Sequence, residues 1–180
     1  MEAANVIIFS TFTLIVASMI WARIYFFKVE SEGARFVSYF NDPAVAIQMG
    51  GFYYCIFTLD SYWIDWKISE LLFLVGIVMF FWAMRTAKQL DFANSSRFGG
   101  LVTNGPFAYV RHPCYSSYML FWIGNSILFQ MPIIWIATVV LILVYAYSAK
   151  QEEDQIMSGI LAKEYEEYRN KVGMFWPKFG

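Results

Sequence analysis

The sequence predicts an all-α membrane protein with five transmembrane helices and a C-terminal amphipathic helix. Two observations lead to this fold class. Hydrophobic residues make up 59% of the chain and charged residues only 15%, whereas a soluble domain carries about 25% charged residues. The apolar residues also fall in long blocks, as membrane-spanning helices require. We therefore expect residues 1–180 to form a single integral membrane domain, with three spans in 1–89 and a core of loop, helical hairpin and C-terminal flap in 90–180.

The first two blocks differ in how clearly they begin. The first runs from about Asn5 to Phe27 and lacks the basic leader and cleavage site of a signal peptide, which predicts a helix kept in the mature protein. A polar connection, 28–41, then leads to Asp42-Pro43, a capping residue followed by proline. This pair predicts that the second helix begins there and covers Ala44 to Leu59.

The remaining blocks predict a third span and a helical hairpin. The third span runs from Ser69 to about Gln89, and 90–100 is a loop by composition. Pro113 to Gln130 and Ile133 to Tyr147 follow as two apolar blocks of similar length. The turn between them, Met131-Pro132, is so short that the two helices must be antiparallel.

This hairpin brings basic and acidic residues to the same depth. Counted outward from the turn, His112 lies as far back as Gln151 lies forward, and Arg111 matches Glu152. Each arm rises roughly 27–30 Å at about 1.5 Å per residue, which is enough to cross the hydrocarbon core. We therefore expect the acids of 152–154 beside Arg111 and His112, at the cytoplasmic boundary.

The loop before the fourth helix predicts an anion site. Gly105-Pro106 indicates a turn, and Pro113 suits a first helical position because its missing N–H would be unbonded there. The unpaired N–H groups and the dipole of this helix N-terminus favour an anion. Without further information, the alternative is that Arg111 and His112 merely anchor a helix end among lipid headgroups.

The C-terminal segment beyond Lys150 predicts a helical flap that covers Arg111, His112 and the acids of 152–154. Apolar and aromatic residues recur at helical spacing between charged ones, at Ile156, Ile160, Leu161, Tyr165 and Tyr168. We expect the flap to lie on the cytoplasmic face, with its two tyrosines packed against the membrane.

The basic residues predict the topology. If the N-terminus lies outside, twelve of the 13 Lys and Arg residues fall in cytoplasmic segments, and only Lys67 lies outside. The positive-inside rule requires this split of five spans with the N-terminus outside and the C-terminus inside. We expect a multi-pass protein of a bacterial or archaeal inner membrane or of the endoplasmic reticulum, with its site at the cytoplasmic face.

Several partners are not indicated. The net charge of −1 does not point to a nucleic acid, and the sequence predicts no particular oligomeric state. One histidine and no Cys-x-x-Cys motif leave zinc without plausible ligands, so we expect no metal.

The C-terminal half resembles the isoprenylcysteine carboxyl methyltransferase family, and more broadly the membrane methyltransferases that include phospholipid N-methyltransferases. The resemblance covers about Leu90 to the end and rests on the order of LVTNGPFAYVRHPCYSSYM, an apolar hairpin, QEEDQIM and KEYEEYRNKVGMFWP. It implies an S-adenosylmethionine-dependent enzyme whose cofactor site is not a Rossmann fold, in agreement with the lack of a G-x-G-x-x-G motif.

The resemblance also implies the site residues. In that family the cofactor is held by the loop before R-H-P, by R-H-P itself and by the acidic helix. Carried over to this sequence, the cofactor-binding residues are Val102, Gly105, Phe107, Arg111, His112, Pro113, Tyr115, and Glu152 or Glu153. Arg111, His112 and Glu153 are the candidate catalytic residues. The chain departs from the family at Phe107, where tyrosine is usual, and at Ser116-Ser117, where a glycine is common.

These residue types suit the chemistry of that cofactor. Arg111, His112 and the helix N–H groups suit its carboxylate. An acid from Glu152 and Glu153 suits its amino group or ribose hydroxyls, and the face of Tyr115 suits the sulfonium. An acceptor carboxylate is already ionised at neutral pH, whereas an amine would need Glu153 or His112 as a base.

Three function classes follow. We favour methyl transfer to a lipophilic acceptor that enters from the bilayer, either a lipidated or small-molecule substrate with an isoprenylcysteine-like carboxylate or, alternatively, the amine of a membrane lipid. The second class is a membrane reductase of the sterol-reductase type, which binds a nicotinamide cofactor. The third is a non-enzymatic membrane protein, which would bury polar residues mid-span, whereas we expect the span centres to be nearly bare.

Overall fold

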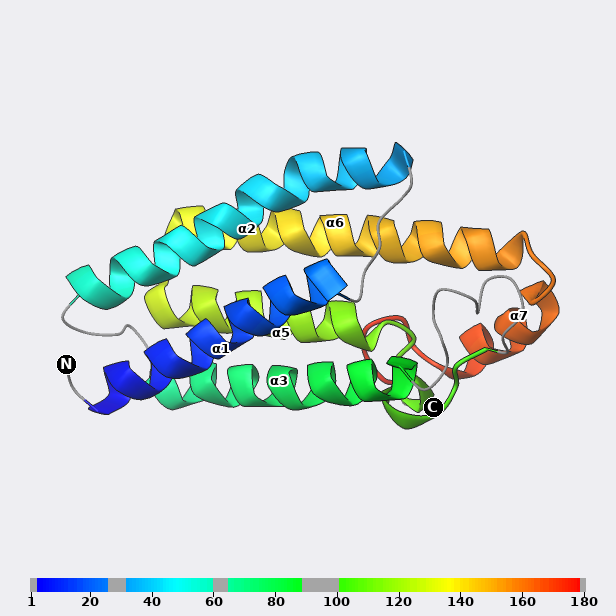
Figure 1. Cartoon of the computed structure of the whole chain (residues 1–180), viewed down its shortest axis with the longest axis horizontal. Helices are drawn as coiled ribbons and strands as arrows, with labels where there is room; N and C mark the ends of the chain where they lie inside the picture. The colour runs from blue at the N-terminus through cyan, green and yellow to red at the C-terminus, as the bar shows by residue number, and fades with distance from the viewer. Residues whose placement is uncertain (1–2, 26–31, 60–64, 89–100, 179–180) are drawn as a thin grey trace. The chain divides into compact units, whose positions relative to one another are not determined.

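The computed structural model describes residues 3–25, 32–59, 65–88 and 101–178. In these ranges the chain is helical apart from turns and one isolated bridge between backbone segments. The helices are α1 (Ala3–Tyr25), α2 (Glu32–Thr58), α3 (Trp66–Lys88), the short 3-10 helix η1 (Gly105–Ala108), α5 (Pro113–Phe129), α6 (Pro132–Met157) and α7 (Ala162–Lys171) (Figure 1). The predicted all-α class is confirmed for the described residues.

Three of the described helices are long and apolar enough to cross a membrane. They are Ala3–Tyr25, Trp66–Ala87 and Pro132–Met157, with mean hydropathies of 2.0, 1.8 and 2.1. The apolar part of Pro132–Met157 ends before Lys150, after which charged residues follow. That the chain spans a membrane five times stays a prediction.

Two helices differ in extent from the sequence prediction. Residues 32–41 were expected to be a connection, but α2 already begins at Glu32 and continues through Pro43. A proline inside a helix removes one backbone hydrogen bond, which neighbouring helices compensate more readily in membrane proteins. The last helix was expected to end at Tyr147, but α6 continues to Met157. It can do so because residues 148–157 contain no proline or glycine to stop it.

The described residues pack in two compact units, and α3, α5 and α6 contribute residues to both. Unit 1 consists of 1–75 and 119–144, and unit 2 consists of 76–118 and 145–180. The expected division of one membrane domain at residue 89 stays a prediction.

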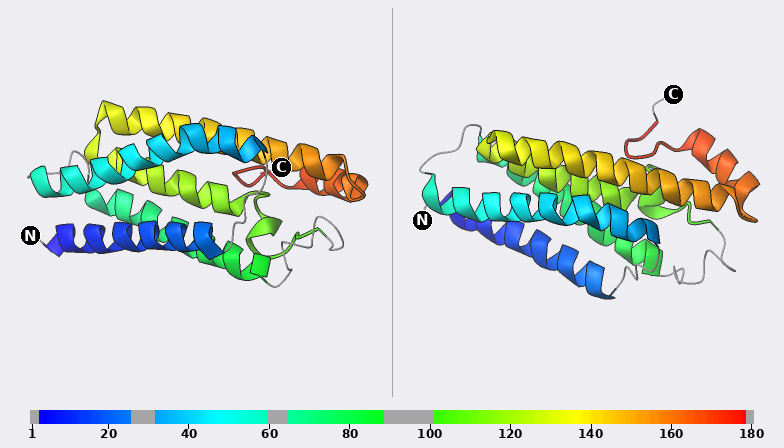
Figure 2. Two further views of the ribbon diagram at one scale, coloured as in Figure 1. Left: turned by 45° about the horizontal axis from the view of Figure 1, so that its top comes forward. Right: turned by 90° about the horizontal axis from the view of Figure 1, so that it is seen from above.

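The core of unit 1 is aromatic. The rings of Phe12 and Phe52 stack with their centroids 3.7 Å apart, and Phe73 from α3 lies beside Phe12. Figures 1 and 2 show α1 and α2 running lengthwise along the unit-1 parts of the other helices. Gly124 lets α5 approach α3, because a Cβ there would lie 2.8 Å from the ring of Phe73.

Polar side chains also hold unit 1 together, so the expectation of nearly bare span centres is wrong. Gln48 is fully buried and donates hydrogen bonds from Nε2 to the Thr138 hydroxyl at 2.6 Å and to the carbonyl of Ile134 at 3.0 Å. Asn125 donates to Oε1 of Gln48 at 2.6 Å, which links α2, α5 and α6. Because lipid tails are as apolar as leucine, such interhelical hydrogen bonds help helices associate in a bilayer.

Unit 2 contains every described residue of the predicted site. It joins the end of α3, the η1 turn, the start of α5, the end of α6, and α7. Gly105 fixes the η1 turn against α3, since its φ is +58° and a Cβ would lie 2.7 Å from the hydroxyl oxygen of Thr86. Only glycine adopts this left-handed backbone without strain and leaves space for the threonine.

Candidate active site

The C-terminal segment after α7 runs beside the loop that precedes α5. Val110 and Gly173 form a parallel β-bridge. The backbone N–H of Arg111 donates to the carbonyl of Gly173 at 2.8 Å, and that of His112 donates to the carbonyl of Met174 at 3.0 Å. These hydrogen bonds fix the backbone at Arg111 and His112 and therefore the direction in which their side chains point.

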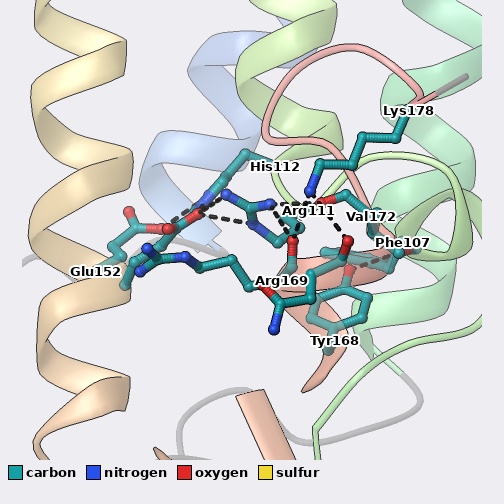
Figure 3. A network of polar contacts seen from close by, with 10 residues as sticks. Phe107, Arg111, His112, Glu152, Tyr168, Arg169, Val172 and Lys178 are labelled. Carbon is teal, nitrogen blue, oxygen red and sulfur yellow. Dashed lines mark hydrogen bonds and ion pairs between the residues drawn. The ribbon is translucent and has the colours of Figure 1, made fainter. Parts of the chain in front are cut away.

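The guanidinium of Arg111 is nearly buried and pairs with groups of the protein. Its Nε and Nη2 both lie 2.9 Å from Oε1 of Glu153, and its Nη1 donates to the carbonyls of Arg169, at 3.2 Å, and Val172 (Figure 3). Only 7% of its side chain is exposed. Arg111 therefore connects α6, the C-terminal end of α7 and the loop before α5.

His112 lies between two acids, as the hairpin predicts. Its Nε2 is 3.0 Å from Oε1 of Glu153, and its Nδ1 is 3.5 Å from Oε2 of Glu152. Burial by itself lowers the pKa of His112, but the hydrogen bonds and negative charges of Glu152 and Glu153 outweigh burial and raise this pKa above 6.5. When both ring nitrogens carry protons, the imidazolium donates toward both carboxylates.

The two acids differ in their surroundings. Glu153 exposes 5% of its side chain, and its Oε1 lies within hydrogen-bonding distance of both Arg111 and His112. Glu152 exposes 52% of its side chain, and its Oε1 accepts a hydrogen bond from the Tyr115 hydroxyl. Neighbours on one helix thus occupy different environments, because successive residues point about 100° apart.

An aromatic group adjoins these polar side chains. The ring of Tyr115 stacks on that of His112, with centroids 5.8 Å apart, and on that of Tyr145, with centroids 5.5 Å apart. Aromatic rings carry negative charge on their faces and can attract cations.

The other predicted cofactor-binding residues also belong to unit 2. Gly105 and Phe107 belong to η1, and Pro113 is the first residue of α5. Phe107 and Pro113 are buried, and Val102 is partly buried in the segment leading to η1. The structure therefore keeps the first turn of α5, with its unpaired N–H groups, directly after His112.

Two residues were assigned to the wrong surroundings. Tyr165 and Tyr168 were expected to pack against the membrane, but they are buried with Val172 inside unit 2. The Tyr168 hydroxyl donates to the carbonyl of Phe107 at 2.6 Å, and burial raises the pKa of Tyr168 to about 12, so the hydroxyl keeps its proton. Ile160, by contrast, is 88% exposed in the turn between α6 and α7.

The backbone contacts of the C-terminal segment are the part of the site that sequence reasoning missed. The i, i+3 spacing of the two tyrosines signals a buried helix face, but no residue pattern indicates which carbonyl groups a segment such as 172–174 offers. Among the described residues, no group of three His, Cys, Asp or Glu side chains is placed to hold a metal ion.

The chain is similar to a known protein family and to curated proteins. The model of the phospholipid methyltransferase family matches residues 65–164. The human protein-S-isoprenylcysteine O-methyltransferase is 25% identical over 128 aligned residues, which cover 64% of this chain and 45% of that protein. A probable protein-S-isoprenylcysteine O-methyltransferase of Oryza sativa subsp. indica is 24% identical over 119 residues, 63% of this chain and 62% of the rice protein. The chain thus spans about half the length of the curated relatives that it matches.

Proposed function

This chain belongs to the phospholipid methyltransferase family, and on that premise we propose that it transfers a methyl group from S-adenosylmethionine to a lipophilic acceptor in the membrane. The favoured acceptor is the carboxylate of an isoprenylcysteine-like substrate, because the curated relatives carry the name of that activity. The amine of a phospholipid is the alternative, in keeping with the description of the family.

One observation carries the proposal. His112 lies 3.0 Å from Glu153 and 3.5 Å from Glu152. The loop before α5 and helix α6, about 40 residues apart in sequence, therefore meet in one polar site, which we call the polar corner. A positively charged side chain, a helix N-terminus, an exposed carboxylate and an aromatic face adjoin there. A cofactor with a carboxylate, an ammonium and a sulfonium needs this combination of groups.

The residues present fit this cofactor. The first turn of α5, beginning at Pro113, suits a carboxylate, since helix N–H groups attract anions. The half-exposed Glu152 offers acceptor positions for N–H or O–H groups. The ring of Tyr115 is partly exposed beside His112, and aromatic rings attract cations. When bound, S-adenosylmethionine supplies an electrophilic methyl group attached to a positively charged sulfur.

The protein contributes mainly by positioning. Methyl transfer requires nucleophile, methyl carbon and sulfur in line, and holding reactants in such a geometry is a large source of rate enhancement. An acceptor carboxylate needs no base because it is ionised at neutral pH. An amine acceptor must lose a proton, for which His112, above its pKa, is available, whereas Oε1 of Glu153 is already paired with Arg111 and His112.

We also propose that the chain crosses the membrane five times, with α2 and α5 as spans besides the three apolar helices. The N-terminus then lies outside and the C-terminus inside, because this leaves only Lys67 among 13 basic residues on the outer side. The polar corner around His112 lies at the cytoplasmic face in this arrangement.

Incubation of the purified protein with methyl-labelled S-adenosylmethionine and candidate lipids tests the function. We expect label in the lipid fraction when a prenylcysteine carboxylate is supplied, and release of that label as methanol by mild base, because esters are base-labile. Label that stays on a phospholipid after base treatment identifies the amine acceptor instead. Binding of NADPH in place of S-adenosylmethionine contradicts the proposal and favours the reductase class, and binding of neither cofactor contradicts it and favours a non-enzymatic membrane protein.

A further inference from the structure

We infer that Ser116 is a positioning residue whose hydroxyl holds Phe175 of the C-terminal segment beside His112, and so fixes the packing of the histidine in the polar corner. Its effect on methyl transfer rests on the proposed function, whereas the contact itself does not. Ser116 and Ser117 are adjacent buried serines of α5, and the sequence leaves them equivalent. Their hydrogen bonds distinguish them.

The hydroxyl of Ser116 reaches outside its own helix. It lies 2.9 Å from the carbonyl oxygen of Phe175 and 3.1 Å from that of His112. The carbonyl of His112 already accepts the backbone N–H of Ser116 at 3.0 Å, whereas the hydrogen bonds of the described residues include no other donor to the carbonyl of Phe175. Ser117, in contrast, donates to the carbonyl of Pro113 at 2.8 Å, within α5. Of the two serines, Ser116 is therefore the one that connects α5 to the C-terminal segment.

This contact continues a row of backbone hydrogen bonds. The carbonyls of Gly173 and Met174 accept N–H groups of the loop before α5 at 2.8 Å and 3.0 Å, and the carbonyl of Phe175 comes next. Pro113, which follows that loop, has no N–H to continue the row. The N–H of Ser116 is used inside the helix. A side-chain hydroxyl therefore extends the pairing into the first turn of α5.

Phe175 packs against the histidine of the polar corner. The ring centroids of Phe175 and His112 are 6.0 Å apart, and the ring of Tyr115 lies 5.8 Å from the same imidazole. Phe175 is partly exposed, so burial holds its ring less firmly than that of a core residue. The hydrogen bond from Ser116 accordingly contributes to keeping this ring in place.

The rest of the C-terminal segment is fixed independently of Ser116. Toward α7, Gly173 forms the bridge to the loop before α5. Beyond Phe175, Nζ of Lys178 donates to two carbonyls in the last turn of α7, at 3.0 Å and 3.3 Å. Loss of the Ser116 hydroxyl should therefore move Phe175 locally and leave the remainder of the segment paired.

The NMR signals of His112, the only histidine in the chain, test the contact. A neighbouring aromatic ring shifts the resonances of the imidazole protons, and the limiting shifts at low and high pH separate this effect from protonation. We propose to measure these limiting shifts in detergent for the wild type, Ser116→Ala, Phe175→Leu, the double variant and Ser117→Ala. Ser117→Ala is the matched control, because it removes an equally buried hydroxyl from the same helix and also introduces a residue that helices favour.

The expected pattern is specific to one serine. Phe175→Leu changes the limiting shifts by removing the ring, and Ser116→Ala changes them in the same direction. Ser116→Ala adds nothing in the Phe175→Leu background, because the serine acts through the phenylalanine. Since one hydrogen bond is lost, Ser116→Ala should also weaken the binding of S-adenosylmethionine by about two- to tenfold. Ser117→Ala should leave both the shifts and the binding as in the wild type.

Several outcomes overturn the inference. Wild-type shifts in Ser116→Ala, or the same response in Ser117→Ala, contradict the contact. A further change in the Phe175→Leu background shows that Ser116 acts on His112 directly. The expected shifts together with wild-type binding of S-adenosylmethionine by Ser116→Ala exclude a positioning role in the reaction. A wild-type protein that binds no S-adenosylmethionine contradicts the proposed function instead, and the shifts still decide whether Ser116 holds Phe175.

Discussion

His112 is a residue whose protonation the surrounding structure changes. Its pKa is raised because the hydrogen bonds and charges of Glu152 and Glu153 outweigh the effect of burial. A folded-state pKa above the unfolded value means that the imidazolium stabilises the fold fully at pH values below the unfolded pKa. This stabilisation is lost as the pH rises through the folded pKa.

We predict that His112 titrates with a midpoint above 6.5 in the folded protein. It is the only histidine in the chain, so one imidazole signal in the NMR spectrum reports on it without assignment. Glu152→Gln should lower the midpoint by removing one of its two acidic partners, and Glu166→Gln should not. A midpoint at or below 6.5 in the wild type would show that burial dominates over the acids.

Among the elements, the η1 turn depends most on a single backbone position. Gly105 has a φ of +58° and lies against Thr86 and Trp82 of α3, where a Cβ would be 2.7 Å and 3.3 Å from their side chains. The η1 turn also contains Phe107, whose carbonyl accepts the hydrogen bond from the hydroxyl of Tyr168 in α7. One glycine therefore affects contacts of three helices in unit 2.

We predict that Gly105→Ala destabilises the protein by about 1–2 kcal/mol from the left-handed backbone alone, with a further loss from the contact with Thr86. Gly50→Ala is the matched control, because a Cβ there meets nothing within 4 Å and alanine is favoured over glycine inside a helix by about 0.5–1 kcal/mol. Thermal unfolding in detergent compares the two variants. Equal melting temperatures would contradict the described packing of the turn.

At the scale of the whole molecule, the topology is open to a direct test. Both native cysteines, Cys55 and Cys114, are first replaced by alanine. We predict that Lys67→Cys reacts with a membrane-impermeant maleimide added outside intact cells, and that Lys163→Cys reacts only after permeabilisation. The reason is that five spans with the N-terminus outside place these two residues on opposite sides. Labelling of both from the same side would rule out this arrangement.

Much of the site was predictable because it depends on local geometry. The start of α5 at Pro113 and the short turn before Pro132 follow from proline positions and apolar block lengths. Since a helix rises by a constant amount per residue, equal arm lengths bring His112 to the depth of Glu152 and Glu153. The contacts of 3.0 Å and 3.5 Å confirm that expectation.

Other features were not predictable because they depend on which distant groups meet. The continuation of α2 through Pro43 and the buried hydrogen bonds of Gln48 need neighbouring helices that no local pattern identifies. Tyr165 and Tyr168 have the spacing of a packed helix face, yet the sequence does not indicate whether lipid or protein covers it.

The sequence by itself determined the helical character, the hairpin and the meeting of basic and acidic residues, because apolar length and helical rise are local properties of the chain. The tertiary structure alone decided that residues 172–174 form backbone hydrogen bonds with the loop before α5 and that Arg111 forms an ion pair with Glu153. It also decided that Glu153 is buried while Glu152 is exposed. The physical reason is that burial and hydrogen-bond partners depend on what packs against each face of a helix, which is fixed only when segments distant in sequence come together.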